Sequence, residues 1–204
     1  MRTTLTVFLS FLLSLSAFLL TGCEETKEVD VYHDWQARNE AFMDSLANVF
    51  DARSDASLGR IEDERNKGYY IYYKRIATGD EKQPSPYYNS TITAFYRGML
   101  INEAVFAACP APKHLTTQYK NLTVFDSNFT GNDPTDFDSP SSFTVNGVIS
   151  GWTEVLQWMH PGDRWEIYIP YISAYGSTST TAIPAYSSLV FDITLVAVTQ
   201  LEVK

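Results

Sequence analysis

The spacing of apolar residues divides the chain into a helical first part and a β-rich second part. Within residues 34–53 the apolar positions recur at helical spacing, which predicts one amphipathic helix. Its apolar face comprises Trp35, Phe42, Leu46, Val49 and Phe50. Asp34 is the expected N-cap. A weaker continuation, interrupted at Gly59, gives an N-terminal helical segment over 34–65. The apolar face has to be covered, either by the rest of the chain or by a second copy in a homodimer formed through residues 34–53.

From Gly68 onward the pattern changes to short β-rich runs separated by turn residues. The runs predicted as strands are 69–76, 91–100, 164–169 and 188–198. Within the second run, Ile92, Ala94 and Tyr96 lie two residues apart and share one face. A short helix is predicted over 152–159, and the stretch 128–142, rich in proline and aspartate, is predicted as a long loop.

The first residues show a third pattern. Met1 and Arg2 precede an apolar run, Leu5–Leu20, which is shorter than the roughly 20 residues that a membrane-spanning helix needs. A signal peptide over 1–22 is therefore predicted. The run closes with Leu20-Thr21-Gly22-Cys23, which resembles the bacterial lipobox. This resemblance implies cleavage before Cys23 and lipidation of Cys23.

A lipid anchor implies a location in the bacterial cell envelope, at the outer membrane, on either its periplasmic or its surface face. Two or three acyl chains hold a protein stably on a membrane, whereas a single chain binds only marginally. Residues 23–33, with Glu24, Glu25 and Glu28, are the expected tether. The alternative is an ordinary signal peptide followed by a chance cysteine.

Composition narrows the class of function. The 204 residues are 45% hydrophobic and 14% aromatic, enough for one packed core, and the net charge of -9 argues against nucleic-acid partners. The three histidines are scattered, and neither a glycine-rich phosphate loop nor a Gly-x-Ser-x-Gly motif occurs. We therefore expect no metal and no cofactor. With Cys23 lipidated, Cys109 has no cysteine to pair with and is expected to be a small buried hydrophobe.

Several short motifs follow one another in the second part. They are Phe95-Tyr96-Arg97-Gly98, Phe125-Asp126-Ser127, Val148-Ile149-Ser150-Gly151-Trp152, Met159-His160-Pro161-Gly162, Ala174-Tyr175-Gly176, Ile183-Pro184 and Leu189-Val190-Phe191. In this order they resemble the FKBP-type peptidyl-prolyl cis-trans isomerase family. The resemblance implies an α+β fold over 66–204, in which a bent antiparallel β-sheet wraps around a short central helix. The amphipathic helix would be an N-terminal addition to it.

The resemblance also implies an activity. Members of this family rotate X–Pro amides, so the implied substrates are proline-containing polypeptide clients, here exported proteins that are folding. Amide resonance sets a barrier of about 18–20 kcal/mol, and rotation breaks no bond, so neither a nucleophile nor a cofactor is needed. A dry pocket removes the water hydrogen bonds that stabilise the planar amide, and placed donors favour the twisted form.

Site residues follow from the same resemblance. Trp152 is the implied floor under the proline ring, and Ile183 is implied at the rim. The implied walls are Tyr96, Phe125, Val148, Ile149 and Phe191. Asp126, Tyr175 and the backbone N–H of Ile149 are the implied catalytic groups, with Tyr175 and the N–H holding carbonyls of the client.

Three departures from the family pattern bear on this site. Ser141 stands where the family often has an aromatic residue, so Phe143 is expected in the core. No arginine lies between Asp126 and Arg164, so a nearby arginine partner for that carboxylate is not expected. Two inserts, 102–124 and 128–142, either roof the pocket or enlarge a protein-binding face.

Two functions of other classes remain open at this point. A catalytically weak FKBP-like chaperone or protein-binding lipoprotein would share the fold without the reaction. A glycan-binding surface lipoprotein would use the tyrosine-rich run 68–73.

Overall fold

The structure is a computed structural model that describes residues 31–101 and 122–200. Its helices and strands are α2 (Trp35–Asp51), β1 (Leu58–Glu62), β2 (Tyr70–Ala77), β3 (Thr91–Leu100), β4 (Thr123–Ser127), β5 (Ser141–Thr144), η2 (Val145–Gly147), α4 (Ser150–Leu156), β6 (Arg164–Ile169), η3 (Tyr171–Ser173) and β7 (Leu189–Thr199). The expected signal peptide, Cys23, Cys109 and most of the first insert lie outside the described residues.

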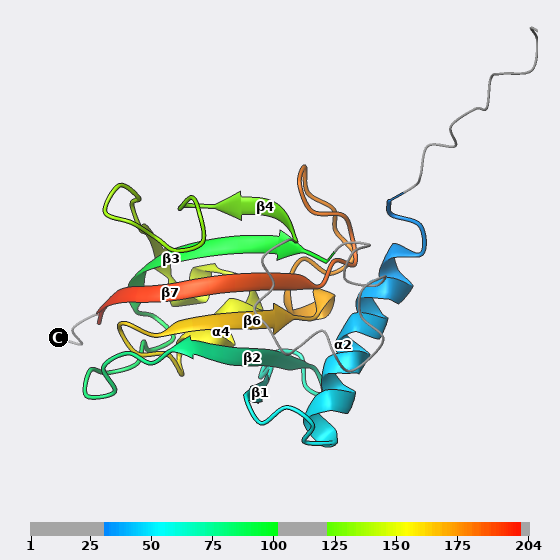
Figure 1. Ribbon diagram of the computed structural model, residues 1–204, viewed down its shortest axis with the longest axis horizontal. Coiled ribbons are helices and arrows are strands. Elements are labelled where there is room, and N and C mark those ends of the chain that lie inside the picture. The colour runs from blue at the N-terminus through cyan, green and yellow to red at the C-terminus, as the bar shows by residue number, and fades with distance from the viewer. Residues whose placement is uncertain (1–30, 102–121, 201–204) are drawn as a thin grey trace, which may run out of the picture. The chain divides into compact units, whose positions relative to one another are not determined.

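All strands pair antiparallel in one sheet, in the order β1-β2-β6-β7-β3-β4, with β5 also on β3 (Figure 1). The ten-residue strand β3 pairs along its whole length with β7. On its other edge, the first half of β3 pairs with β5 and the second half with β4. The four predicted strands are confirmed, and the α+β fold with them. The predicted helix 152–159 is also found, starting and ending earlier as α4.

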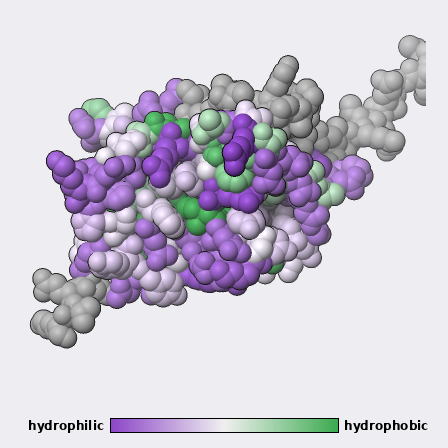
Figure 2. All heavy atoms as spheres, turned by 90° about the horizontal axis from the view of Figure 1, so that it is seen from below, coloured by the Kyte–Doolittle hydropathy of each residue, from purple (hydrophilic) through white to green (hydrophobic). Residues whose placement is uncertain are grey.

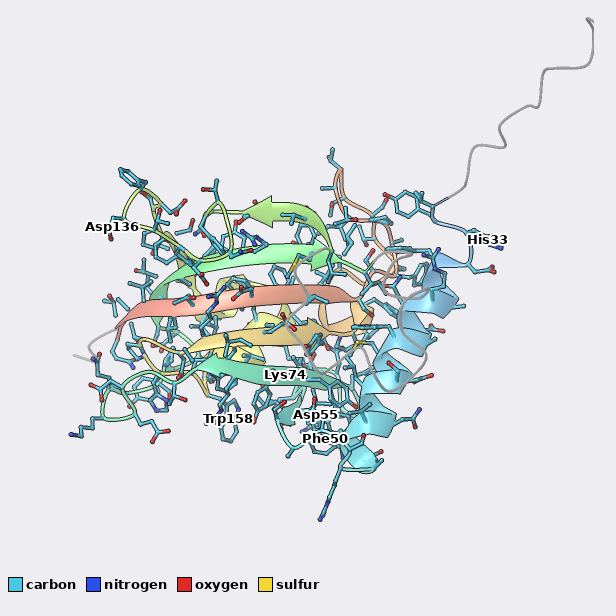
Figure 3. All side chains as sticks on the ribbon, in the orientation of Figure 1. His33, Phe50, Asp55, Lys74, Asp136 and Trp158 are labelled. Carbon is cyan, nitrogen blue, oxygen red and sulfur yellow. The ribbon has the colours of Figure 1, made fainter. Side chains whose placement is uncertain are left out.

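The helical interpretation of residues 58–62 is wrong, because this stretch is the edge strand β1. Two contacts favour the strand. Lys74, only 6% exposed, forms an ion pair with Asp55 at 2.8 Å, which turns the chain back onto the sheet after α2 (Figure 3). The Tyr73 ring also lies directly over Gly59, so that a side chain on residue 59 would overlap it. In the sequence Gly59 suggests an interruption of a helix, whereas in the structure it allows close packing between two strands.

The two faces of the sheet are both apolar, and each is covered by a helix. Ile167, Ile169 and Phe191 belong to the cluster around α4, whereas their chain neighbours Tyr168 and Val190 belong to the cluster around α2. Successive side chains of a strand point to opposite faces, so α4 and α2 pack on opposite sides of the sheet. The outer surface seen in Figure 2 is mainly hydrophilic, with apolar side chains gathered near its middle.

Helix α2 confirms the predicted periodicity and packs against its own chain. Phe42, Leu46 and Val49 are buried in the cluster that also holds Tyr72 and Tyr168. Figure 1 shows the helix crossing the sheet near one end of the strands. Covering of the apolar face by the same chain is therefore the alternative that the structure supports, and the homodimer through 34–53 stays a prediction.

Polar contacts fix the position of α2. The amide oxygen of Asn39, which is fully buried, accepts the backbone N–H of Ser188 at 2.8 Å. The indole of Trp35 donates to the hydroxyl of Ser187 at 2.9 Å. Asp34 occupies the N-cap position, which confirms that expectation, although its side chain makes no capping hydrogen bond. Its carboxylate lies 3.1 Å from His33 instead.

Candidate active site

A cavity of about 490 Å³ opens on the α4 side of the sheet. Its lining comes from β3, β4, β5, β7, the start of α4 and the segment after η3. The lining residues are Tyr96, Phe125, Asp126, Phe143, Gly147, Val148, Ile149, Trp152, Tyr175 and Phe191. Every expected site residue except Ile183 is therefore brought together here, from segments far apart in the sequence.

Trp152 is the centre of the cavity. The rings of Tyr96, Phe143 and Phe191 stand edge-on to its indole, with centroid distances of 5.6, 5.4 and 5.2 Å. Edge-to-face contacts of this kind stabilise aromatic clusters beyond the area they bury. The indole is only 4% exposed and still lines the cavity, so it forms the floor and the other rings form the walls.

The local sequence explains how Trp152 reaches this position. Gly151 lies so close to Ile169 of β6 that an added Cβ would be 2.5 Å from its side chain. This close approach lets the first turn of α4 rest on the sheet. Thr153 donates its hydroxyl to the carbonyl of Val145 at 2.8 Å and ties the helix to the preceding turn. The Gly-Trp-Thr sequence thus sets both the depth and the direction of the indole.

Ile149 is the N-cap of α4. Its carbonyl accepts the N–H groups of Trp152 and Thr153 at 3.0 and 3.1 Å. N–H groups at the start of a helix have no intrahelical acceptor. The N–H of Ile149 is therefore suited to bind an acceptor brought by a guest in the cavity.

The polar edge of the cavity is formed by Asp126 and Tyr96. The hydroxyl of Tyr96 donates to the exposed carboxylate of Asp126 at 2.7 Å. Among the described residues this carboxylate has no arginine within ion-pair distance. Arg164, the next arginine in sequence, binds Asp192 and Asp133 instead. The tyrosine hydroxyl thus takes the place of an arginine partner.

We expect Tyr96 to stay protonated well into alkaline solution. Burial, followed by the hydrogen bond and the negative charge of Asp126, raises the pKa of Tyr96 to about 12. Because this folded-state pKa lies above the ordinary value near 10, the corresponding stability is complete below pH 10 and is lost as pH rises through 12. NMR of ring-labelled tyrosine should show late ionisation in the wild type and earlier ionisation in Asp126→Asn. The control Asp136→Asn should leave the pKa of Tyr96 unchanged. An unchanged pKa of Tyr96 in Asp126→Asn as well would contradict the pairing.

Tyr175 lies at the mouth of the cavity and is 43% exposed. It lies just after η3. The carbonyl of Ser173, the last residue of η3, accepts a hydrogen bond from the hydroxyl of Ser150 in α4 at 3.2 Å. Gly176, which follows Tyr175, has a φ of +62°, a value that favours glycine, and its N–H donates to the carbonyl of Tyr171 at 2.8 Å. These bonds fix the backbone on both sides of Tyr175 and leave its ring at the rim.

Two expectations about single residues need correction. Phe143 lines the cavity instead of lying only in the core, because β5 pairs with β3 and sets Phe143 opposite Ile92, on the face that carries Tyr96. Ile183 does not line the cavity; it is 4% exposed and packed in the core cluster around Trp152. Phe143 and Thr144 are residue types enriched in strands, and this weak signal could have placed Phe143 in a strand.

The loop 128–140 leaves the cavity open. Arg97 and Arg164, which lie on the α2 side of the sheet, bind the carbonyls of Gly131 and Asn132. None of residues 128–142 lines the cavity. Of the two uses expected for this insert, roofing the pocket is therefore wrong. The first insert lies mostly outside the described residues.

The described residues contain neither a metal-binding cluster nor a membrane-crossing helix. No group of three or more His, Cys, Asp or Glu side chains in 31–101 and 122–200 is arranged to hold a metal ion. Over the same residues, no helix has the length and apolarity to cross a membrane.

An antiparallel sheet packed on a short helix, with a tryptophan-floored aromatic cavity at the start of that helix, defines the FKBP-like class of protein. Comparisons with known proteins agree. The family model for the FKBP-type peptidyl-prolyl cis-trans isomerase matches residues 110–196. The "Outer membrane protein MIP" of Legionella longbeachae is 30% identical over 190 residues, covering 89% of this chain and 69% of that protein. The chain therefore belongs to the FKBP-type peptidyl-prolyl cis-trans isomerase family.

Two further matches show how far the similarity extends. The "Macrophage infectivity potentiator" of Trypanosoma cruzi is 45% identical over 86 residues, which is 42% of this chain and only 41% of that protein. The crystal structure of a peptidyl-prolyl cis-trans isomerase from Pseudomonas syringae superposes on this chain with a TM-score of 0.53 at 25% sequence identity. The superposed region covers 79% of this chain and 96% of the Pseudomonas syringae chain.

Proposed function

We propose that this protein catalyses cis-trans isomerisation of X–Pro bonds in polypeptides. The observation that carries the proposal is the cavity floored by Trp152, which is apolar, open and large enough for a pyrrolidine ring. Membership of the family supports the same activity. The substrates are proline-containing segments of clients that are still folding, since an extended or unfolded stretch exposes its X–Pro bonds to the cavity.

The catalytic effect follows from the environment of the amide. Uncatalysed X–Pro rotation takes tens to hundreds of seconds because amide resonance favours the planar state. When the proline ring rests on Trp152, the surrounding rings exclude the water that stabilises the charge-separated planar amide. The N–H of Ile149 and the hydroxyl of Tyr175 hold carbonyls of the client, and Asp126 presents negative charge at the edge. No bond is formed or broken, and no proton has to leave the protein.

We place the protein in the bacterial cell envelope, anchored by lipid on Cys23 and facing either the periplasm or the surface. The sequence before Cys23 supports this, as does the name of the Legionella longbeachae relative, an outer membrane protein. Exported polypeptides are then the clients within reach of the site. Labelling cells with a radioactive fatty acid should mark the wild type but not Cys23→Ser, and equal labelling of both would reject the anchor.

A protease-coupled isomerisation assay with short Xaa-Pro peptides tests the activity. We expect the wild type to accelerate exchange and Tyr175→Phe, which removes only the rim hydroxyl, to lower kcat/KM about tenfold. Tyr87→Phe is the matched control, because Tyr87 is 65% exposed and does not line the cavity. Full activity in Tyr175→Phe would remove that hydroxyl from the mechanism. Absence of activity in the wild type, with retained binding of unfolded protein, would favour the non-catalytic chaperone.

A further inference from the structure

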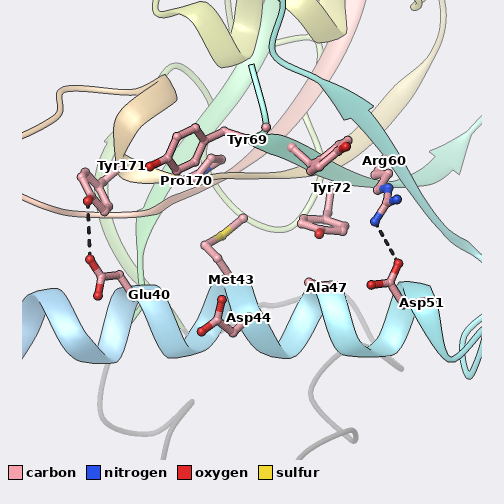
Figure 4. Close-up of a pocket in the computed structure, with 12 residues that line it drawn as sticks. Glu40, Met43, Asp44, Ala47, Asp51, Arg60, Tyr69, Tyr72, Pro170 and Tyr171 are labelled. Atoms are coloured by element: carbon pink, nitrogen blue, oxygen red, sulfur yellow. Dashed lines mark hydrogen bonds and ion pairs between the residues drawn. The ribbon is translucent and has the colours of Figure 1, made fainter. Parts of the chain in front are cut away.

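A second hollow, of about 360 Å³, lies between α2 and the β1–β2 hairpin (Figure 4). Its size falls at the lower end of the range of about 300–1,000 Å³ that is usual for ligand pockets. It is lined by Glu40, Met43, Asp44, Ala47, Asp51, Arg60, Gly68, Tyr69, Tyr70, Tyr72, Pro170 and Tyr171. We call it the α2 groove. Because Tyr72 belongs to the α2 side of the sheet, the groove lies on the opposite face from the cavity of Trp152.

The two walls of the α2 groove differ in chemistry. One wall is a stripe along one face of α2, where residues three or four positions apart lie side by side. This stripe carries the carboxylates of Glu40, Asp44 and Asp51. The other wall is tyrosine-rich, and Tyr69 on it is 44% exposed. Between the walls, Met43 and Ala47 are half-buried and present apolar surface.

Side-chain pairs close both ends of the α2 groove, as Figure 4 shows. At one end the hydroxyl of Tyr171 donates to Glu40 at 3.4 Å. At the other end Arg60 binds Asp51 at 2.9 Å. The guanidinium of Arg60 also lies 4.3 Å from the centre of the Phe50 ring and 4.4 Å from the centre of the Tyr70 ring, and these contacts fix it at this end of the groove. Arg60 therefore neutralises Asp51, whereas within residues 31–101 and 122–200 neither Glu40 nor Asp44 has an ion-pair partner, and Glu40 accepts hydrogen bonds only from the uncharged groups of Gln36 and Tyr171.

Asp44 stands in the middle, next to Met43. Its carboxylate is exposed and has no ion-pair partner in the described part of the chain. An apolar floor with a free carboxylate beside it matches a long basic side chain, whose methylene stem packs on apolar surface while its charged end stays at the rim. The exposed Tyr69 ring adds an attractive face for a cation.

We propose that the α2 groove binds a lysine or arginine side chain of an extended polypeptide segment. The stem lies over Met43 and Ala47, and the cation lies between Glu40 and Asp44. A second copy of this chain, with a net charge of -9, is a poorer electrostatic match than a basic segment. The site is separate from the prolyl cavity and lets the protein hold a client by a segment that contains no proline.

Fluorescence anisotropy with the full chain tests the proposal. The probe is a labelled peptide, Gly-Leu-Lys-Leu-Lys-Leu-Gly, and its counterpart has glutamate in place of lysine; neither contains proline. We expect the lysine peptide alone to bind, with an affinity that falls as salt rises. Asp44→Asn and Glu40→Gln should each weaken binding about two- to fivefold, the range of single exposed charge pairs.

Asp136→Asn is the matched control, because it removes the same charge from the 128–140 loop, far from α2 in Figure 3. Binding of this variant should equal that of the wild type. Equal binding of the lysine and glutamate peptides would overturn the proposal, as would equal effects of Asp44→Asn and Asp136→Asn. Sedimentation showing a dimer that Asp44→Asn dissociates would also overturn it, because the groove would then be occupied by a second copy.

Discussion

Replacing Trp152 by alanine is expected to abolish isomerase activity and to destabilise the fold by about 3–5 kcal/mol. The indole is both the floor of the cavity and the centre around which Tyr96, Phe143 and Phe191 are arranged. Its removal takes away the surface for the proline ring and lets the walls collapse. Chemical denaturation measures the free energy of unfolding, and the protease-coupled assay measures kcat/KM.

A matched control exists on the same segment. Trp158 follows α4 and is 60% exposed (Figure 3), so Trp158→Ala should change stability by no more than about 0.5 kcal/mol and leave activity intact. Because Trp152→Ala risks unfolding, Trp152→Leu is the second variant. Leucine keeps an apolar side chain and part of the volume, but it offers no flat ring as a floor. This variant should remain folded with kcat/KM lowered at least about tenfold. Wild-type activity in folded Trp152→Leu would show that the indole is not the floor.

The second large effect is expected from a single added methyl group, in Gly98→Ala. A Cβ at residue 98 would lie 2.5 Å from the Phe125 ring and 2.7 Å from the Phe191 ring. Both rings line the cavity, so both have to move, which costs about 1–3 kcal/mol and reshapes the walls. We expect kcat/KM for Xaa-Pro peptides to fall about tenfold or more while the far-ultraviolet circular dichroism stays unchanged.

A double-variant cycle separates this mechanism from general damage to β3. The smaller side chain in Phe125→Leu makes room for the methyl group. The variant Gly98→Ala/Phe125→Leu should therefore be more stable than the sum of the two single changes predicts. Strict additivity would mean that the methyl group does not act through the Phe125 ring.

Periodic and local features could be predicted from the sequence. The 3.6-residue spacing in α2 and the β-rich runs gave these elements close to their observed bounds, because burial of one face fixes both patterns. The position of Trp152 could be predicted from the Val-Ile-x-Gly-Trp motif because that motif is local. Gly151 and Trp152 are adjacent, and their shared role at the start of α4 depends on contacts within a few residues and with one strand.

Features that depend on distant partners could not be predicted. Asn39 is a polar residue on a helix, and nothing in its neighbourhood reveals that it binds the backbone of Ser188. From the sequence alone Gly59 suggests an interruption of a helix, and only the structure shows that the Tyr73 ring lies over it. Ile183, an isolated hydrophobic residue in a polar loop, suits a rim or a core equally well, and only the packing around Trp152 decides between them.

The most direct test of the account is exchange NMR on a peptide such as Ala-Leu-Pro-Phe with a catalytic amount of the full chain. Without protein, cis and trans forms interconvert over tens to hundreds of seconds and give no exchange peaks on the time scale of the measurement. We expect exchange peaks when wild-type protein is added, and much weaker peaks with the same amount of folded Trp152→Leu. Peptide signals that shift on binding to the wild type, with interconversion as slow as before, would contradict the account.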